Sequence, residues 1–593
     1  MFFLFRKIFC CFFSIYRKIM IKNEDSCAVY GFIIVFLQLV NHEMNMKRLL
    51  LHLLVLLSIP AMAQEKDHNF DVAKNLDVLN VIYKHLDMMY VDTLDANEVI
   101  GNGIRAMLRS LDPYTVYYTS DDMKDLRELR TGTYAGVGSV IRKNLKLNRV
   151  IISEPYEGMP AAEAGLKRGD VILAIDDEDM REKDVSYVSD HLRGDAGTSF
   201  MIKVLRPSTG KTMKMKLTRR AIQMPAVPFY GMRPDGVGYI NLNSFTEGSA
   251  RDVRRAVLEL RRQGMRGLVF DLRGNGGGSE QEAVNIVNMF VPKGQLIVSN
   301  RSKLQQMNRD YKTTVEPIDS VMPLVVLVDD DTASASEITS GALQDLDRAV
   351  ILGTRTYGKG LVQVTTDLPY NSSLKLTTSK YYIPSGRCIQ AINYKHARGG
   401  YVEHVPDSLT HVFYTQGGRE VRDGGGIKPD VELKADSMTN LVANLVYLDS
   451  AEVMLNYELD YVAKHPTIGP AATFKLTDAD YEEFKQRVLK SNFKYDRSTE
   501  TYLDNLEKLA RFEGYYDDAR TDFENLRAKL KHNVEKDLDY NKETLMQLLA
   551  NNIVHNYYYQ RGTIENSFLW DKQLQEAERL IKTPEEYEKI LRP

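Results

Sequence analysis

The chain has 593 residues, of which 44% are hydrophobic and 26% are charged, and its formal net charge is −3. This length exceeds what one hydrophobic core accommodates and predicts about three or four domains. The balanced charge offers no electrostatic footprint for nucleic acid or for an anionic membrane surface, which excludes both as main partners. Cys388 is the only cysteine beyond the first 30 residues, so neither an internal disulfide framework nor a cysteine zinc site is expected.

Residues 1–63 contain an export signal. A basic start at Met46 is followed by an apolar run, Leu49–Ile59, and then by the small-residue pattern Ala61-Met62-Ala63. This order is typical of a secretory signal peptide, which we place over about Met46–Ala63. The apolar run is too short for a comfortable transmembrane helix. The sequence therefore predicts an exported, periplasmic protein.

Residues 1–43 lie upstream of this signal and admit two interpretations. Their richness in Phe, Cys and Ile fits a membrane segment with Tyr30–Val40 as its apolar part. The preferred interpretation is that translation starts at Met44 or Met46, so that the stretch is never made. Membrane association is expected only if residues 1–43 are real.

Residues 64–132 are predicted to be helical. Apolar side chains recur at three- and four-residue steps between Val78 and Met89, which indicates an amphipathic helix. A second helix is expected over Asn97–Ser110, with Asp95 as its N-cap and the Asp112-Pro113 pair as its break.

Residues 133–220 have a different texture, with short β-rich runs separated by glycine-rich turns. The predicted strands are Arg149–Ser153, Val171–Ile175 and Phe200–Leu205. One short helix is expected at Ala161–Ala164. A small β-sandwich or barrel follows from this pattern.

Residues 221–435 alternate between strand and helix patterns, which predicts an α/β domain with a largely parallel sheet. The predicted strands are Gly238–Leu242, Gly267–Asp271, Leu324–Val328 and Ala349–Leu352, and the predicted helices are Ser249–Gln263, Glu280–Phe290 and Ala335–Gln344. Residues 436–593 are charged, rich in tyrosine and helical in pattern, with no catalytic signature. We expect this extension to serve as a scaffold or as a contact for an adaptor or a second copy of the chain.

The β-rich segment carries a glycine turn, Tyr134–Gly138, and the string Pro-Ala-x-x-Ala-Gly-Leu-x-x-Gly-Asp that begins at Pro160. Together they resemble the PDZ domain in its circularly permuted bacterial form. The resemblance implies that Gly136, Val137 and Gly138 hold the terminal carboxylate of a peptide, which adds a strand to the neighbouring sheet edge. The alternative is that these glycines only permit a tight turn.

Four segments of the α/β domain contain residues that are suited to catalysis. The glycine cluster Asp271–Gly278 follows a strand and exposes N–H groups that can bind an anion or an oxyanion. Ser334 stands where a strand turns into a helix, with the N–H of Ala335 next to it. Lys359 lies between two glycines, and Gln363 follows it by four residues.

These segments resemble the C-terminal processing peptidases (tail-specific proteases) of the S41 family over about residues 75–435. Two further strings, Tyr382–Arg387 and Gly426–Asp430, support the match. The resemblance implies a crotonase/ClpP-like catalytic fold between a PDZ module and helical flanking segments. It also implies the roles of five residues: nucleophile Ser334, general base Lys359, its orienter Gln363, and oxyanion donors Gly277 and Ala335.

Three departures from the family pattern are visible. Gly276 stands where proline is usual, Thr332-Ala333 replaces part of a small-residue run, and Ala391–Asp423 lengthens the gap between two motifs. None removes a reacting atom, although the Gly277 assignment can be off by one residue.

The predicted chemistry follows from the side chains. A serine hydroxyl needs a base, and a lysine can serve if burial lowers its pKa from a reference value of about 10.4. Gln363 would bond the amine without adding the negative charge that raises its pKa. No cofactor and no metal are expected. The expected substrates are unfolded or tail-exposed proteins with apolar C-termini.

Several alternatives compete with this interpretation. Gly353–Lys359 fits G-x-x-x-x-G-K, but Gly360 follows where a P-loop has Ser or Thr, and the next segment reads as a strand. A Ser-His-Asp triad would need a histidine near the lengthened segment Ala391–Asp423, but His396, His404 and His411 are expected to be solvated loop residues. A non-catalytic PDZ scaffold of the same fold is the remaining class. Asp329–Asp331 are interpreted as an acidic turn before a helix N-terminus rather than as a metal site. Cys388 is interpreted as a packed residue rather than as a nucleophile.

Overall fold

The computed structural model describes residues 46–391, 407–434, 437–449, 451–491, 493–495, 498–531 and 533–592. The possible membrane segment in residues 1–43 lies outside the described residues, as do residues 392–406 of the segment Ala391–Asp423, with His396 and His404. The chain forms two units, Met1–Gly103 and Ile104–Pro593, each considered by itself.

The first unit is helical. Helix α3 (Met46–Met89) includes the predicted signal peptide, and α4 (Ala96–Arg109) begins at the predicted place. The carboxylate of Asp95 accepts hydrogen bonds from the N–H groups of Asn97 and Glu98 at 2.7 and 3.1 Å, which confirms the predicted N-cap. Over the described part of the chain, no helix combines the length and the apolarity that a membrane crossing requires.

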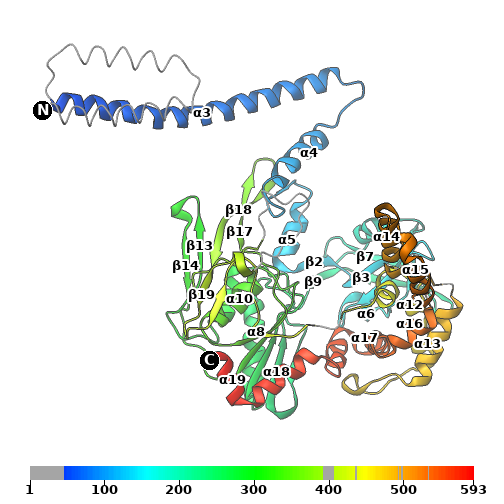
Figure 1. The fold of residues 1–593 in the computed structure, drawn as a ribbon. Helices are drawn as coiled ribbons and strands as arrows, with labels where there is room; N and C mark the ends of the chain where they lie inside the picture. The colour runs from blue at the N-terminus through cyan, green and yellow to red at the C-terminus, as the bar shows by residue number, and fades with distance from the viewer. Residues whose placement is uncertain are drawn as a thin grey trace. The chain divides into compact units, whose positions relative to one another are not determined.

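A six-stranded sheet forms the centre of the α/β domain (Figure 1). Its order is β10 (Phe229–Met232), β11 (Val237–Asn241), β12 (Gly267–Asp271), β15 (Leu324–Val328), β16 (Val350–Gly353) and β21 (Val431–Glu432). All neighbours from β11 to β21 are parallel, and β10 is antiparallel. The strand and helix alternation therefore predicted the four parallel strands β11, β12, β15 and β16, whereas the edge strands β10 and β21 were not predicted.

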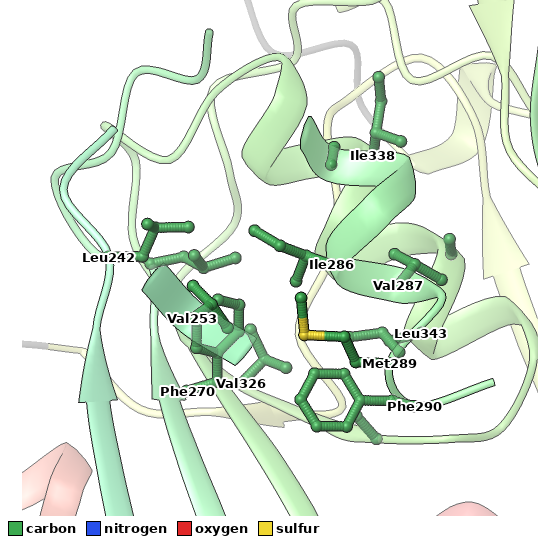
Figure 2. Close-up of a cluster of buried hydrophobic side chains, with 14 of the residues drawn as sticks. Leu242, Val253, Phe270, Ile286, Val287, Met289, Phe290, Val326, Ile338 and Leu343 are labelled. Carbon is green, nitrogen blue, oxygen red and sulfur yellow. The ribbon is translucent and has the colours of Figure 1, made fainter. Parts of the chain in front are cut away.

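Helices cover both faces of this sheet. One face packs against α8 (Ser249–Arg262), α9 (Glu280–Val287) and α10 (Ala335–Asp345) through a large buried apolar cluster. Figure 2 shows Leu343 of α10 beside Met289 and Phe290 within this cluster, which also includes Phe270 and Val326 of the sheet. Burial of this interface holds the start of α10 firmly against the strands.

The opposite face packs against the end of the chain. Helices α18 (Lys572–Lys582) and α19 (Pro584–Leu591), drawn in red in Figure 1, join a second apolar cluster with β11, β12, β15 and β16. Leu574, Leu580 and Tyr587 are buried there against the strands. The sequence pattern predicts these helices as part of a separate extension and gives no sign of this packing.

A second sheet lies in the same unit. Its strands are β1 (Val116–Tyr118), β18 (Ser372–Tyr382), β13 (Leu296–Ser302) and β14 (Arg309–Lys312), and β17 (Leu361–Leu368) also pairs with β18. The prediction of an entirely helical segment over residues 64–132 was wrong at β1. Its Val-Tyr-Tyr sequence favours extended backbone, and it pairs antiparallel with β18. Helix α5 (Met123–Thr131) follows.

Residues 133–220 form a β module. Its sheet order is β3 (Ser139–Asn144), β4 (Arg149–Pro155), β5 (Val171–Ile175), β7 (Ser199–Arg206) and β8 (Lys211–Thr218), with β6 (Glu178–Asp179) on β5. Strands β2 (Thr133–Gly136) and β9 (Arg220–Gln223) form a separate pair. Helices α6 (Pro160–Glu163) and α7 (Val185–Leu192) enclose an apolar core with the sheet.

The remaining C-terminal residues are helical, as predicted. The helices are α11 (Asn440–Ala443), the π-helix η4 (Asn444–Leu448), α12 (Val453–Lys464), α13 (Asp478–Lys490), α14 (Ser498–Glu513), α15 (Tyr516–Lys529), α16 (Val534–Tyr540) and α17 (Lys542–Ser567). A third apolar cluster joins most of them. Helix α12 also contacts the β module, because Leu455 and Leu459 are buried with Ile151 and Val171.

Candidate active site

Ser334 lies at the turn between β15 and α10. It is the N-cap of α10, half-buried, with φ 57° and ψ −114°. A positive φ is costly for a residue with a side chain and persists only where the surroundings impose it. Every residue of α10 is buried. The packed helix therefore holds a strained serine at the surface of the domain.

The glycine cluster after β12 lies against this serine. An added Cβ on Gly277, whose φ is 97°, would meet the Ala333 carbonyl oxygen at 2.7 Å and both Ala335 N and Ser334 Cβ at 2.9 Å. Only glycine fits so close to the main chain. The approach brings the loop to the N-terminus of α10, as the sequence predicted.

The hydrogen bonding of the two predicted oxyanion donors differs. The N–H of Gly277 donates to Asn275 Oδ1 at 2.9 Å. The N–H of Ala335 has no hydrogen-bond partner within the described residues, as expected for the first turn of a helix. Ala335 therefore offers a free donor beside Ser334, whereas the donor of Gly277 is engaged.

Lys359 is half-buried in the segment between β16 and β17. Its pKa is lowered to about 8, chiefly because burial disfavours the ammonium form and also because Lys375 is close; Glu337 and Asp112 act in the opposite direction. The Nζ atom lies 4.2 Å from the centroid of the Tyr114 ring. It forms no hydrogen bond or ion pair with the described part of the chain.

Glu337 ties the serine segment to the lysine segment. One carboxylate oxygen accepts the N–H groups of Ser334 and Lys359 at 2.8 and 2.9 Å. The other accepts the Thr356 hydroxyl at 2.6 Å and the Gly358 N–H at 2.8 Å. Burial raises the pKa of Glu337 to about 7, while these four hydrogen bonds act to lower it. The bonds fix two backbones that are 25 residues apart in sequence.

Tyr381 of β18 makes a second bridge between these segments. Its buried hydroxyl donates to the carbonyl oxygen of Ser334 at 3.2 Å and to the carbonyl oxygen of Lys359. The two sheets of the domain thus meet at the candidate site.

Gln363 is oriented differently from the prediction. Its Nε2 donates to Thr377 Oγ1 at 3.2 Å. The main-chain N–H of Thr377 in turn donates to Thr115 Oγ1 at 3.2 Å. Gln363 is thereby linked to the wall that β1 and β18 form, and its role as an orienter of Lys359 stays a prediction.

Three residues of the site were not singled out from the sequence as parts of it: Tyr114, Glu337 and Tyr381. A signal existed for Glu337, because Ser-x-x-Glu at a helix start is the pattern of a capping box. Tyr114 lies beside the Asp112-Pro113 pair, which was interpreted only as a helix break. Tyr381 lies in a strand, and nothing in its sequence surroundings distinguishes it from a core residue.

The competing sites can be compared with this geometry. The segment after Gly360 is strand β17 rather than the helix that a P-loop requires. His411 is an exposed loop residue whose Nδ1 lies 3.1 Å from Asp423. The carboxylate of Asp329 accepts the N–H of Gly274 and the hydroxyl of Thr332, which gives this acidic residue a structural role.

The predicted peptide cradle lies at the edge of the β module. Gly136 ends β2, Val137 is buried, and Gly138 has φ 72° with Met159 packed closely against it. The next strand, β3, is the first of its sheet, and β4 is its one partner in the described strand order. Its other edge is therefore available for an added peptide strand.

The α/β domain, the β module and the C-terminal helices each match a known protein family. Residues 236–396 match the model of peptidase family S41, residues 151–206 match the PDZ domain, and residues 445–581 match the C-terminal helical domain of probable PDZ-proteases.

Individual relatives extend this match across domains. A carboxy-terminal-processing protease of Bartonella bacilliformis is 35% identical over 324 residues, which are 54% of this chain and 73% of that protein. A carboxy-terminal processing protease of Bacillus subtilis is 32% identical over 56% of this chain and 68% of its own length. The solved photosystem II D1 C-terminal processing protease is 29% identical, with a TM-score of 0.35 over 63% of this chain and 91% of that one. The chain belongs to peptidase family S41, among the carboxy-terminal processing serine proteases that carry a PDZ domain.

Proposed function

We propose that this chain is an exported serine endopeptidase that recognises protein C-termini and cleaves them with a dyad of Ser334 and Lys359. The observation that carries the dyad is the Glu337 carboxylate, which binds the backbone N–H groups of both residues. This link holds a strained serine and a half-buried lysine on one wall of the domain.

Acylation begins with neutral Lys359. Its amine accepts the proton of the Ser334 hydroxyl as Oγ attacks the carbonyl carbon of the scissile bond. The ammonium then gives that proton to the leaving amine, and the acyl group stays on Ser334. A pKa of about 8 leaves a useful fraction of the amine neutral near neutral pH.

Deacylation repeats these steps with water. Lys359 takes a proton from the attacking water, and the ammonium returns it to Ser334 Oγ as the acyl bond breaks. The N–H of Ala335 supplies one oxyanion donor in both steps. Because the N–H of Gly277 is engaged by Asn275, that of Gly278 is the second candidate for the other donor, one residue from the predicted position.

Substrate capture is assigned to the PDZ module. The turn at Gly136–Gly138 would hold a terminal carboxylate, and the free edge of β3 would pair with the tail that precedes it. Apolar tails are expected because the module core behind this edge is apolar. The chain has no ATP-binding motif, so its substrates are unfolded proteins or proteins with loose tails.

Export is proposed from the sequence of Met46–Ala63, whose basic start, apolar run and small-residue site follow the order of a signal peptide. A periplasmic location follows for a bacterial protein. N-terminal sequencing of the secreted product tests it, with Gln64 as the expected first residue.

The function is tested by cleavage of an unstructured protein with an apolar C-terminus. The wild type should cut it, Ser334→Ala and Lys359→Ala should abolish cutting, and a charged tail should protect the substrate. Binding of the tail without any cleavage by the wild type would favour a non-catalytic PDZ scaffold and overturn the proposal.

A further inference from the structure

The candidate oxyanion loop begins at a half-buried arginine. Arg273 directly precedes Gly274–Gly278, and its main-chain N–H and Nε both donate to Asp271 Oδ1, at 3.0 and 2.9 Å. One terminal nitrogen donates to Asp271 Oδ2 at 2.6 Å. The guanidinium therefore fixes the direction in which the chain leaves β12.

The outer side of this guanidinium is held by the other end of the chain. Asp571, the N-cap of α18, accepts one hydrogen bond on each carboxylate oxygen from the two terminal nitrogens of Arg273, at 3.0 and 2.6 Å. Gln573 Oε1 accepts a further bond from Arg273 at 2.9 Å. Two-pronged charge-assisted pairs of this kind fix geometry as well as contributing energy.

Asp571 is itself fixed in place. Its Oδ1 accepts the N–H of Leu574 at 3.0 Å, so the same carboxylate caps α18. Leu574 is fully buried on the central sheet. The position of the carboxylate is thus set by the packing of α18 rather than by a mobile side chain.

Asp571 is also the second of two carboxylates that pair with the positive charge of Arg273. Asp271 is shared, because its Oδ2 accepts the hydroxyl of buried Tyr239 at 2.7 Å. With both acids present the pKa of Arg273 is well above its ordinary value, although burial alone would lower it. Loss of the Asp571 carboxylate would leave the half-buried guanidinium paired with Asp271 alone and without two charge-assisted hydrogen bonds on its outer side.

The loop transmits the position of Arg273 to the serine. After Arg273, Gly274 is bonded to Asp329, and the carbonyl oxygen of Asn275 accepts the N–H of Ala333 and the hydroxyl of Ser336, at 3.0 and 2.9 Å. Gly277 then contacts Ser334 and Ala335. The loop is thus held to the turn before α10 by hydrogen bonds at Gly274 and Asn275 and by the close approach of Gly277.

We propose that Asp571, on the C-terminal helix α18, is a positioning residue for the oxyanion loop and acts through Arg273. The inference rests on the proposed function of Ser334. It makes the end of the chain a working part of the catalytic domain rather than an appended scaffold.

The test compares Asp571→Asn with a matched variant of the same helix, Glu578→Gln, in the full chain. Glu578 pairs with Arg233 at 2.8 Å, and the two side chains are 11% and 20% exposed, against 13% and 21% for Asp571 and Arg273. Both variants therefore remove one half-buried ion pair between α18 and the domain. Only the Asp571 pair leads to the oxyanion loop.

Asp571→Asn should lower kcat by about tenfold and leave KM within about twofold, since a shifted oxyanion donor affects the transition state more than the bound substrate. Glu578→Gln should leave both constants within about twofold, and Asp571→Glu should recover part of the lost kcat. Amide exchange of Gly274–Gly278 should become faster in Asp571→Asn only.

The outcomes separate the two proposals. If cleavage by the wild type does not depend on Ser334, the proposed function fails, and exchange of the loop still decides whether Asp571 positions it. If cleavage depends on Ser334 while Asp571→Asn and Glu578→Gln behave alike in kcat and in loop exchange, the positioning role of Asp571 is overturned.

Discussion

At the scale of single residues, the decisive feature is the state of the Lys359 amine. Burial lowers its pKa to about 8, whereas the Tyr114 ring 4.2 Å away attracts the ammonium form. The ring therefore works against the deprotonation that a general base requires.

This opposition predicts the pH dependence. Because only the neutral amine accepts a proton, kcat/KM should rise as pH increases through about 8 and level off above it. In Tyr114→Leu the ammonium loses its partner, the pKa of Lys359 falls by about half to one unit, and the rising limb shifts to lower pH. The measurement is kcat/KM of both proteins between about pH 6 and 10.

Tyr114→Phe is the matched control, since it keeps the ring and removes only the hydroxyl. Its rising limb should coincide with that of the wild type. A limb that stays in place in Tyr114→Leu, or one that moves equally in Tyr114→Phe, would show that the ring does not set the pKa of Lys359.

The site residues differ in how far the sequence predicts them. Ser334 and Lys359 each stand in a short motif that identifies them directly. In the structure, the Glu337 carboxylate binds the backbone N–H groups of both residues. Gln363 does not behave in this way, because the pairing of β17 with β18 shifts register between Val362 and Gln363 and places Gln363 opposite Thr377. Such a bulge is set by the two strands together, so the partner of Gln363 could not be derived from its spacing to Lys359.

At the scale of elements, the turn after β12 matters most. Gly277 is pressed against the main chain of Ala333 and Ala335, and its φ of 97° is unfavourable for a residue with a side chain. Its neighbour Gly276, where the family usually has proline, has no atom within 4 Å of an added Cβ and no positive φ. The two adjacent glycines are therefore under opposite constraints.

Gly277→Ala should lower kcat/KM by about a hundredfold or more, because the added Cβ must displace backbone around Ser334 and the oxyanion donor. Gly276→Ala should change kcat/KM by no more than about twofold. Steady-state kinetics on the same tail substrate decides between them. Equal losses in both variants would mean that the close approach at Gly277 has no catalytic consequence.

Three buried strands were predicted to the residue. Strands β5, β12 and β15 have the predicted bounds, because each is an apolar run between turn residues. The short strand β1 was missed because a run of three residues is too short to show a hydrophobic period. It becomes a strand by pairing with β18. The docking of α18 on the sheet depends on a contact between residues about 300 positions apart, which no local pattern encodes.

At the scale of the whole molecule, the C-terminal helices contact two other domains of the second unit. Helix α18 packs on the catalytic sheet, and α12 packs on strands β4 and β5 of the PDZ module. The second contact includes the ion pair of Arg142 with Glu452, whose two hydrogen bonds are 2.7 and 2.5 Å long. The C-terminal helices thus contact the module at β4 and β5 and, through Arg142, at β3.

Arg142→Met should loosen this tie. It leaves the Glu452 carboxylate, whose side chain is 7% exposed, without its partner, at a cost of about 1–3 kcal/mol. Glu452 also holds φ 56° before α12, a conformation that needs support from its surroundings. Amide exchange of α12 and β5 should become faster, with little change at α10.

Lys464→Met removes an ion pair from the other end of α12, where both side chains are about half exposed, and should cost no more than about 0.5 kcal/mol. Its exchange pattern should match that of the wild type. If Arg142→Met also matches the wild type, the PDZ module moves independently of α12. If the expected difference is found, the pair of Arg142 and Glu452 stabilises the contact between α12 and the PDZ module.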